Sequence, residues 1–171
     1  MLAACGRVGF DAGPDAALPP VIGELDPSFG DGGIFTASSD NEGQVWDIAL
    51  RGAGYVTNGV SFNTAGTSRM EVIALAEDGT IDPAYGTDGH LFLQTPAGAF
   101  GYAIEMLADG SAIIAGDGAF GGEQDNFVLG KLTPAGAQDP SWGSGNFVNY
   151  NIPATNGGDT AWRVVTVDGT T

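Results

Sequence analysis

Short apolar runs alternate with glycine-rich turns along this chain. In Val45-Trp46-Asp47-Ile48-Ala49-Leu50, large apolar side chains alternate with small or polar ones, which is the pattern of a half-buried β-strand. Comparable runs predict strands at 34–36, 55–57, 70–75, 91–93, 102–106, 112–116, 127–132, 147–150 and 162–167, and a polar loop at 61–68. No window keeps apolar residues at helical spacing without a glycine interrupting it, so the pattern predicts an all-β chain.

One turn sequence recurs three times among these strands. It reads Asp26-Pro27-Ser28-Phe29-Gly30, then Asp82-Pro83-Ala84-Tyr85-Gly86, then Asp139-Pro140-Ser141-Trp142-Gly143. The aspartates are 56 and 57 residues apart (82 − 26 and 139 − 82). Two of the predicted strands, 70–75 and 127–132, are separated by 57 residues as well (127 − 70). A fixed period of this size predicts a repeat architecture.

The residue types in this motif favour a structural corner. An aspartate accepts hydrogen bonds from nearby backbone N–H groups, a proline fixes φ, and a glycine adopts the positive φ that ends a turn. The aromatic residue is expected to pin the turn onto the core. These roles fall on Asp26, Pro27, Phe29, Gly30, Asp82, Pro83, Tyr85, Gly86, Asp139, Pro140, Trp142 and Gly143. The aspartates could instead be ligands, but the proline beside each one favours the capping role.

Each complete repeat holds four predicted strands, which is the composition of a propeller blade. The repeats span 25–80, 81–137 and an incomplete 138–171. Because a propeller needs four to eight blades, we interpret the chain as about two and a half four-stranded antiparallel blades of a larger closed propeller. The remaining blades would be its partners. Exposed blade faces would make this piece unstable or oligomeric by itself.

Three aromatic residues occupy matching places in the three repeats. Trp46, Tyr102 and Trp162 each lie in the strand that follows the first strand of its repeat. We therefore expect them to stack as core residues of successive blades.

The motif, its period and the Asp-Gly hairpins resemble the delta-60 repeat family of β-propeller repeats. Members of that family carry a Leu-Asp-x-Ser-Phe-Gly-x-x-Gly turn, and 25–33 is similar to it. The resemblance extends over roughly residues 21–171. The third copy departs from it, with Gln138 in place of the leading leucine and Asn146 in place of the closing glycine. The resemblance implies a propeller fold and transfers no catalytic residue.

The first residues, Met1-Leu2-Ala3-Ala4-Cys5, resemble a bacterial lipobox, in which the cysteine carries a lipid anchor. The charged and apolar regions of a signal peptide do not precede it, so a chance match is the alternative. Residues 6–24 are rich in glycine and proline, as in a flexible tether. An ordinary frayed terminus is the alternative for this segment.

The net charge of the chain argues against some classes of binding partner. With 21 Asp and Glu against 5 Lys and Arg, the net charge is −16, which argues against nucleic-acid binding and against attraction to anionic lipid. Membrane attachment would come through the lipid anchor alone. The single cysteine, Cys5, leaves no intrachain disulfide, and the single histidine, His90, is expected to lie exposed beside a turn. No catalytic triad can be assembled from these residues.

One loop has the composition of a cation site. In 117–126, oxygen ligands for Ca²⁺ could come from Asp117, Glu123, Asp125 and Asn126. The spacing does not match an EF-hand, and a solvated hairpin loop is the alternative. No other cofactor is indicated.

The sequence favours a non-enzymatic binding or scaffold module at the outer surface or in the periplasm of a bacterial cell envelope. Its loops at 61–68, 117–126 and 151–160 would present a surface to a protein or glycan. One alternative is a propeller enzyme acting on extracellular glycans or other polymers, with its catalytic residues in the central channel. Another is a purely structural role in the envelope.

Overall fold

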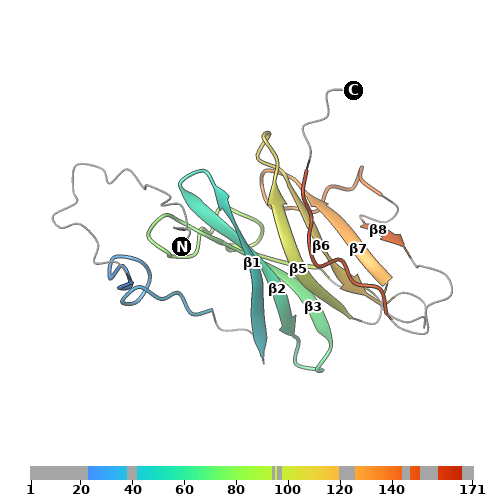
Figure 1. Ribbon diagram of the computed structural model, residues 1–171, viewed down its shortest axis with the longest axis horizontal. Coiled ribbons are helices and arrows are strands. Elements are labelled where there is room, and N and C mark those ends of the chain that lie inside the picture. Colours follow the sequence, from blue (N-terminus) through green and yellow to red (C-terminus); the bar gives the residue numbers. More distant parts are fainter. Residues whose placement is uncertain are drawn as a thin grey trace, which may run out of the picture.

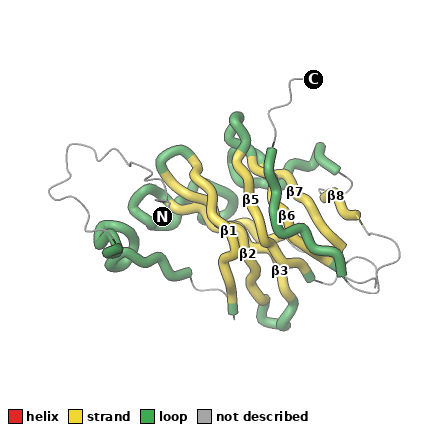
Figure 2. The backbone as a smooth tube through the Cα atoms, in the orientation of Figure 1, coloured by secondary structure: helices red, strands yellow, loops and turns green. Residues whose placement is uncertain are grey.

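The computed structural model describes residues 23–37, 42–93, 95, 98–119, 126–143, 147–150 and 158–166. Within these ranges the chain is all-β, and no helix forms (Figures 1 and 2). The first sheet has the order β1 (Gly43–Arg51), β2 (Gly54–Phe62), β3 (Ser68–Leu75) and β4 (His90–Leu93). The second sheet has the order β5 (Ala99–Met106), β6 (Ala112–Gly118), β7 (Asn126–Leu132) and β8 (Phe147–Tyr150). Neighbouring strands in both sheets are antiparallel.

Each sheet takes its last strand from the repeat that follows. We expected 70–75 to be the fourth strand of its sheet, but β3 is the third, and β4 pairs beside it with Met70 opposite Leu93. The motif turn causes this arrangement, because it reverses the chain at the end of β3, where Leu75 bridges to Ile81. In the same way β8 follows the third copy of the motif and completes the second sheet.

Three other expectations about strands are wrong. The segment 34–36 forms only isolated bridges at Ile34, and 158–166 contains no strand. The predicted loop at 61–68 is shorter, because β2 and β3 extend into it and leave 63–67 as the turn. Asn63 closes that turn by accepting hydrogen bonds from the backbone N–H groups of Ala65 and Thr67.

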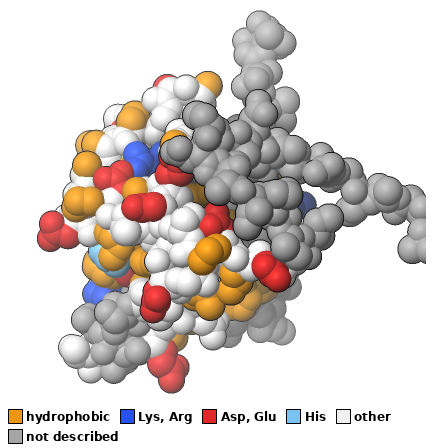
Figure 3. Space-filling view, turned by 90° about the vertical axis from the view of Figure 1, so that its left-hand side faces the viewer, with side chains coloured by type: hydrophobic (Ala, Val, Ile, Leu, Met, Phe, Trp, Pro, Cys, Tyr) orange, Lys and Arg blue, Asp and Glu red, His pale blue; other side chains and the backbone are white. Residues whose placement is uncertain are grey.

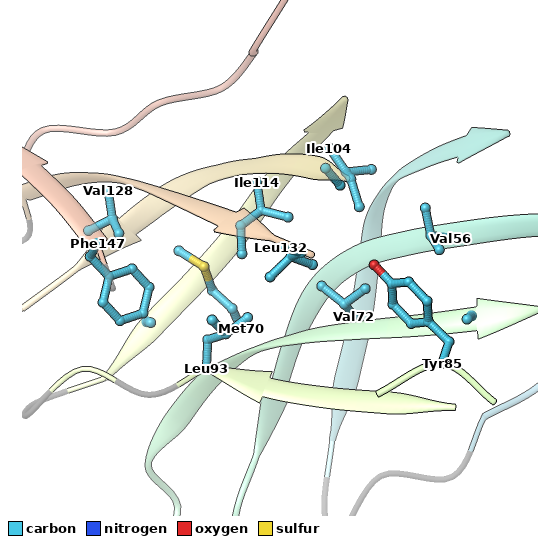
Figure 4. Close-up of a cluster of buried hydrophobic side chains, with 13 residues drawn as sticks. Val56, Met70, Val72, Tyr85, Leu93, Ile104, Ile114, Val128, Leu132 and Phe147 are labelled. Carbon is cyan, nitrogen blue, oxygen red and sulfur yellow. The ribbon is translucent and has the colours of Figure 1, made fainter. Parts of the chain in front are cut away.

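The two sheets pack face to face through β5, which contacts β1, β2 and β3. The core between them is apolar and takes side chains from both sheets, as Figure 4 shows. Its largest members are Val56, Met70, Val72, Tyr85, Leu93, Ile104, Ile114, Val128, Leu132 and Phe147. Burying this apolar surface is the main force that holds the sheets together.

A β-bulge occurs at the same repeat position in β1 and β5. The pairing register of β1 skips Trp46, and the register of β5 skips Tyr102. Opposite each bulge lies a glycine, Gly59 or Gly116, at which a Cβ would collide with a backbone carbonyl of the bulged strand. A bulge bends its strand and re-aims the side chain at the extra residue, so both sheets present an aromatic ring at equivalent places.

The recurring motif forms the same corner three times. In each corner, Oδ1 of the aspartate accepts a hydrogen bond from the backbone N–H two residues later, at 2.9 Å for Asp26 and 3.0 Å for Asp82 and Asp139. The proline next to each aspartate is exposed. The glycine that ends each corner has a φ of 58°, 63° or 71°, a conformation that costs glycine little and other residues more.

The aromatic residue of the first two corners packs on the hairpin turn that ends its own repeat. Phe29 lies against Gly79, and Tyr85 lies against Gly136. The backbone N–H after each aromatic donates to a carbonyl of the same turn, at 2.7 and 2.8 Å. Tyr85 is 1% exposed, whereas Phe29 and Trp142 are half-buried. The aromatic residue of the motif is therefore fully buried only in the second corner.

Candidate binding site

Three aromatic rings from three segments meet along one edge of the paired sheets. The ring centroids of Trp46 and Tyr102 are 5.6 Å apart, and those of Trp46 and Trp162 are 6.4 Å apart, both in edge-to-face geometry. Tyr102 and Trp162 are closer, at 4.4 Å with a tilt of 34°. We call these three residues the aromatic cluster. Such ring pairs stabilise each other beyond the area that they bury.

Two members of the aromatic cluster are exposed to solvent and Tyr102 is half-buried, which corrects the expectation that all three are core residues. Trp46 is 49% exposed and Trp162 is 64% exposed. The reason is their position, because β1 and β5 are edge strands of the two sheets, and the cluster lies along that edge rather than between the sheets. The expected meeting of the three rings is confirmed, and the expected burial is wrong.

A cleft of about 490 Å³ runs beside the aromatic cluster. It is lined by 46–49 of β1, 102–105 of β5 and 162–165. In Figure 1 the segment 158–166, drawn in red, passes along β5 and β6. Ala161 holds this segment in place by donating its backbone N–H to the carbonyl of Gly116 at 3.2 Å. The segment therefore forms the third wall of the cleft without belonging to either sheet.

Asp47 links β1 and β5, the two strands that line the cleft. Its Oδ2 accepts a hydrogen bond from the backbone N–H of Ile104 at 2.9 Å, and its Oδ1 accepts one from Ile48 at 2.9 Å. Both carboxylate oxygens thus bind backbone amides, and one of them crosses from the first sheet to the second. Asp47 is therefore best explained as the residue that fixes the spacing of β1 and β5.

A buried asparagine reinforces this junction. Asn58, on β2, donates from Nδ2 to the carbonyl of Ala103 on β5 at 2.8 Å. Its side chain has 0% exposure, and a polar group at that depth is costly unless it is hydrogen-bonded. Two polar links thus join the sheets beside the cleft, one through Asp47 and one through Asn58.

The mouth of the cleft carries charged and hydroxyl groups. Glu105 of β5 lies at the cleft, and its Oε1 accepts a hydrogen bond from the hydroxyl of Thr166 at 3.4 Å. Arg163 also lines the cleft and is exposed. The cleft therefore combines exposed aromatic rings with a carboxylate that accepts hydrogen bonds and a guanidinium that donates them.

His90 is not the exposed turn residue that we expected. It begins strand β4, is half-buried, and places Nδ1 3.0 Å from Oε1 of the buried Glu71. Its ring stacks on Phe92, with centroids 5.8 Å apart and planes 13° apart. Pairing of β4 with β3 puts His90 beside Ile73. The histidine therefore lies half-buried against the sheet, although its backbone still closes the turn with Thr87.

The predicted calcium loop is described only at its two ends. Asp117 ends up buried in β6, where its Oδ2 accepts a hydrogen bond from the hydroxyl of Thr160 at 3.0 Å, and Asn126 begins β7. Glu123 and Asp125 lie outside the described residues. Among the residues that are described, no three His, Cys, Asp or Glu side chains come together as a metal site. Calcium binding stays a prediction.

The predicted lipid anchor at Cys5 and most of the predicted tether also lie outside the described residues. None of the described segments forms a helix of the length and apolarity that crossing a membrane requires.

The cleft itself was missed by sequence reasoning. The repeat aligned its three aromatic residues correctly, but an apolar residue in a strand is usually assigned to the core. Two signals could have located it: Gly59 and Gly116 are also 57 residues apart (116 − 59), and a glycine inside a strand often marks a bulge. Comparisons with known proteins give no relative, because a scan with models of protein families and a search of the curated proteins both found no match.

Proposed function

We propose that this chain is a non-enzymatic binding module that holds its ligand in the cleft beside the aromatic cluster. The observation that carries the proposal is the exposure of two tryptophans at a place where both sheets and the segment 158–166 converge. Exposing large aromatic side chains to water is unfavourable, and such surfaces commonly mark binding sites. Asp47 is engaged with backbone amides, which favours binding over hydrolysis at this site.

We propose further that the two sheets are blades of a propeller. Three features support this arrangement: the sheets pack face to face, their bulged strands β1 and β5 are in contact, and 158–166 lies along β5 at the equivalent edge. In a propeller the first strands of successive blades surround a central channel. The cleft would then open toward that channel, as ligand sites of such folds do.

The cellular location rests on sequence alone. We propose an extracytoplasmic position in the cell envelope, with Cys5 as the lipid-bearing residue and 6–24 as the tether. Metabolic labelling with a lipid analogue tests this directly. Labelled wild type and unlabelled Cys5→Ser are the expected result, and equal labelling of both would remove the proposal.

The binding function is tested by a thermal-shift screen of small saccharides, peptides and metabolites. A true ligand raises the melting temperature of the wild type, because it binds only the folded state. The same compound should have no effect on Trp46→Ala/Trp162→Ala. Tyr150→Ala is the matched control, since Tyr150 is an equally exposed aromatic residue on β8. A screen in which every shift survives the double substitution would refute binding at the cleft.

A further inference from the structure

We propose that the aromatic cluster is a stacking platform for a neutral carbohydrate. This inference rests on the proposed binding function and specifies its ligand. A pyranose ring has an apolar face of C–H groups and an edge of hydroxyls. The apolar face packs on an indole ring, and the hydroxyls need donors and acceptors around it. Both requirements are met in the cleft.

The spacing of the rings makes them a platform and not a cage. Their centroids are 4.4, 5.6 and 6.4 Å apart, so the rings touch one another and leave no room for a ligand between them. An aromatic cage for a quaternary ammonium group surrounds its cation, with rings on several sides of it. Here a ligand can only lie on the outer surface of the cluster. Because the rings are inclined to one another by 34°, 68° and 78°, a ligand packs on one ring at a time, and Trp162, at 64% exposure, is the more accessible of the two tryptophans. That geometry suits a sugar ring with one apolar face.

The charge of the chain argues for a ligand without negative charge. The net charge is −16, acidic side chains are spread over the face seen in Figure 3, and Asp47 and Glu105 line the cleft itself. Phosphorylated, sulfated or uronic acid ligands would be repelled by this field. A cationic peptide would be attracted by the overall charge and by the two carboxylates of the cleft, with Arg163 alone opposing it. The charges therefore argue against anionic ligands, and a cationic peptide is the competing ligand that the test must separate.

The groups beside the cluster match hydroxyl chemistry. A sugar hydroxyl both donates and accepts hydrogen bonds. Glu105 supplies acceptors, Arg163 supplies donors, and the hydroxyl of Thr166, which bonds Glu105 at 3.4 Å, can do both. The cleft volume of about 490 Å³ lies within the range of about 300–1,000 Å³ found for small-molecule sites. It is therefore large enough for a short oligosaccharide.

The test is titration of the full chain with neutral oligosaccharides, namely β-1,4-linked glucose, xylose, mannose and N-acetylglucosamine hexamers. Binding is measured by calorimetry and by tryptophan fluorescence, with Trp142→Phe used to remove the signal of the third tryptophan. We expect at least one hexamer to bind and to change the fluorescence of the cleft tryptophans. Trp162→Ala should weaken that binding at least tenfold, and Tyr150→Ala should leave it unchanged.

The variants are chosen so that a loss of binding can be separated from a loss of folding. Trp162 is 64% exposed, so its truncation should not unfold the chain, and Arg163→Ala and Glu105→Gln provide second tests of the polar groups. Binding that is insensitive to Trp162→Ala, or no binding by any hexamer, would overturn the carbohydrate inference. A lysine-rich peptide is titrated in parallel. If it binds in a Trp162-dependent way, the binding function stands and the carbohydrate inference falls. If neither ligand binds, the carbohydrate inference falls, and the thermal-shift screen decides the binding function.

Discussion

One repeat position is exposed to solvent in the first sheet and buried in the second. Ile48 of β1 and Ile104 of β5 are 56 residues apart (104 − 48) and occupy equivalent places two residues after the bulge. Ile104 is 4% exposed because it packs in the core between the sheets, whereas Ile48 is 55% exposed. In the second sheet, the face that carries Ile104 is therefore covered by the first sheet. In the first sheet, the equivalent face, which carries Ile48, is exposed to solvent at the edge strand β1.

The difference shows that the repeat places apolar residues at the same positions of both sheets. Whether those residues are buried depends on whether another sheet packs against them. Leu50 of β1 is also exposed, while its equivalent Met106 packs on the core. The sequence keeps apolar residues at these positions of both strands, although only one of the two strands buries them here. Hydrophobic stabilisation depends on the area removed from water, so equivalent residues should contribute very different free energies of folding.

The largest expected effect is a direct contrast of this pair. Ile104→Ala should lower the free energy of unfolding by about 2–4 kcal/mol, because it leaves a cavity in the core. Ile48→Ala should change it by no more than about 0.5 kcal/mol, as for an ordinary surface substitution. Urea denaturation of both variants at one protein concentration measures the difference. Equal losses would mean that the face bearing Ile48 is covered in solution.

The second prediction concerns a feature that should be equal in both sheets. Gly59→Ala and Gly116→Ala each place a Cβ against the carbonyl of the bulged strand opposite. The backbone must move in either case, and we expect each variant to lose about 2 kcal/mol or more of stability. The same urea titrations measure it, with Gly66→Ala as a comparison in which the Cβ would meet no neighbour and only the positive φ of 79° causes strain. A large loss at only one site would show that the two bulges are not equivalent.

The third prediction compares the first two corners. The hydroxyl of Tyr85 is buried without a hydrogen-bond partner among the described residues, and Phe29 fills the equivalent place without a hydroxyl. Tyr85→Phe should therefore be neutral or stabilise the fold by up to about 1 kcal/mol. A loss above that value would indicate a partner for the hydroxyl in solution.

Tyr85 should also give the two corners different alkaline stability. Burial raises the pKa of Tyr85, and Arg51 opposes this shift. A raised pKa in the folded state contributes stability that is present below the unfolded value of about 10 and is lost as the pH rises through the folded value. Thermal melts between pH 8 and pH 11 should show a smaller decline for Tyr85→Phe than for the wild type. An identical decline would contradict the assignment.

The smallest effect is the acid response of the corners. Hydrogen bonds from the hydroxyl and backbone N–H of Ser28 lower the pKa of Asp26, and those of Ser141 lower the pKa of Asp139. The backbone N–H of Ala84 lowers the pKa of Asp82, with a further contribution from Arg51. A lowered pKa in the folded state contributes stability above the unfolded value of about 3.9, which is lost as the pH falls through the folded value.

Asparagine in place of these aspartates keeps an acceptor but does not titrate. The triple variant Asp26→Asn/Asp82→Asn/Asp139→Asn should therefore lose less of its own stability than the wild type between pH 4 and pH 2. Melting temperatures across that range measure the slope, and the single Asp82→Asn variant separates the corner that also contacts Arg51. Parallel slopes for the wild type and the triple variant would show that the corners do not contribute to acid unfolding.

The sequence by itself determined the local features of this protein. The alternating runs gave an all-β chain with most of its strands, the 56- and 57-residue steps gave the equivalence of Asp26, Asp82 and Asp139, and the motif chemistry gave the corner. These features depend on interactions within a few residues or on backbone preferences that each copy repeats. Such preferences can be read from residue types and spacing.

Only the tertiary structure decided which strands share a sheet and which apolar residues meet water. β4 joins the sheet of the preceding repeat, His90 pairs with Glu71, and Trp46 and Trp162 are exposed instead of forming a core layer. Ile48 and Ile104 make the reason plain, because the same residue in the same repeat position is exposed in one sheet and buried in the other. A side chain is buried only when a second surface packs against it, and a local sequence pattern specifies only the first of the two surfaces.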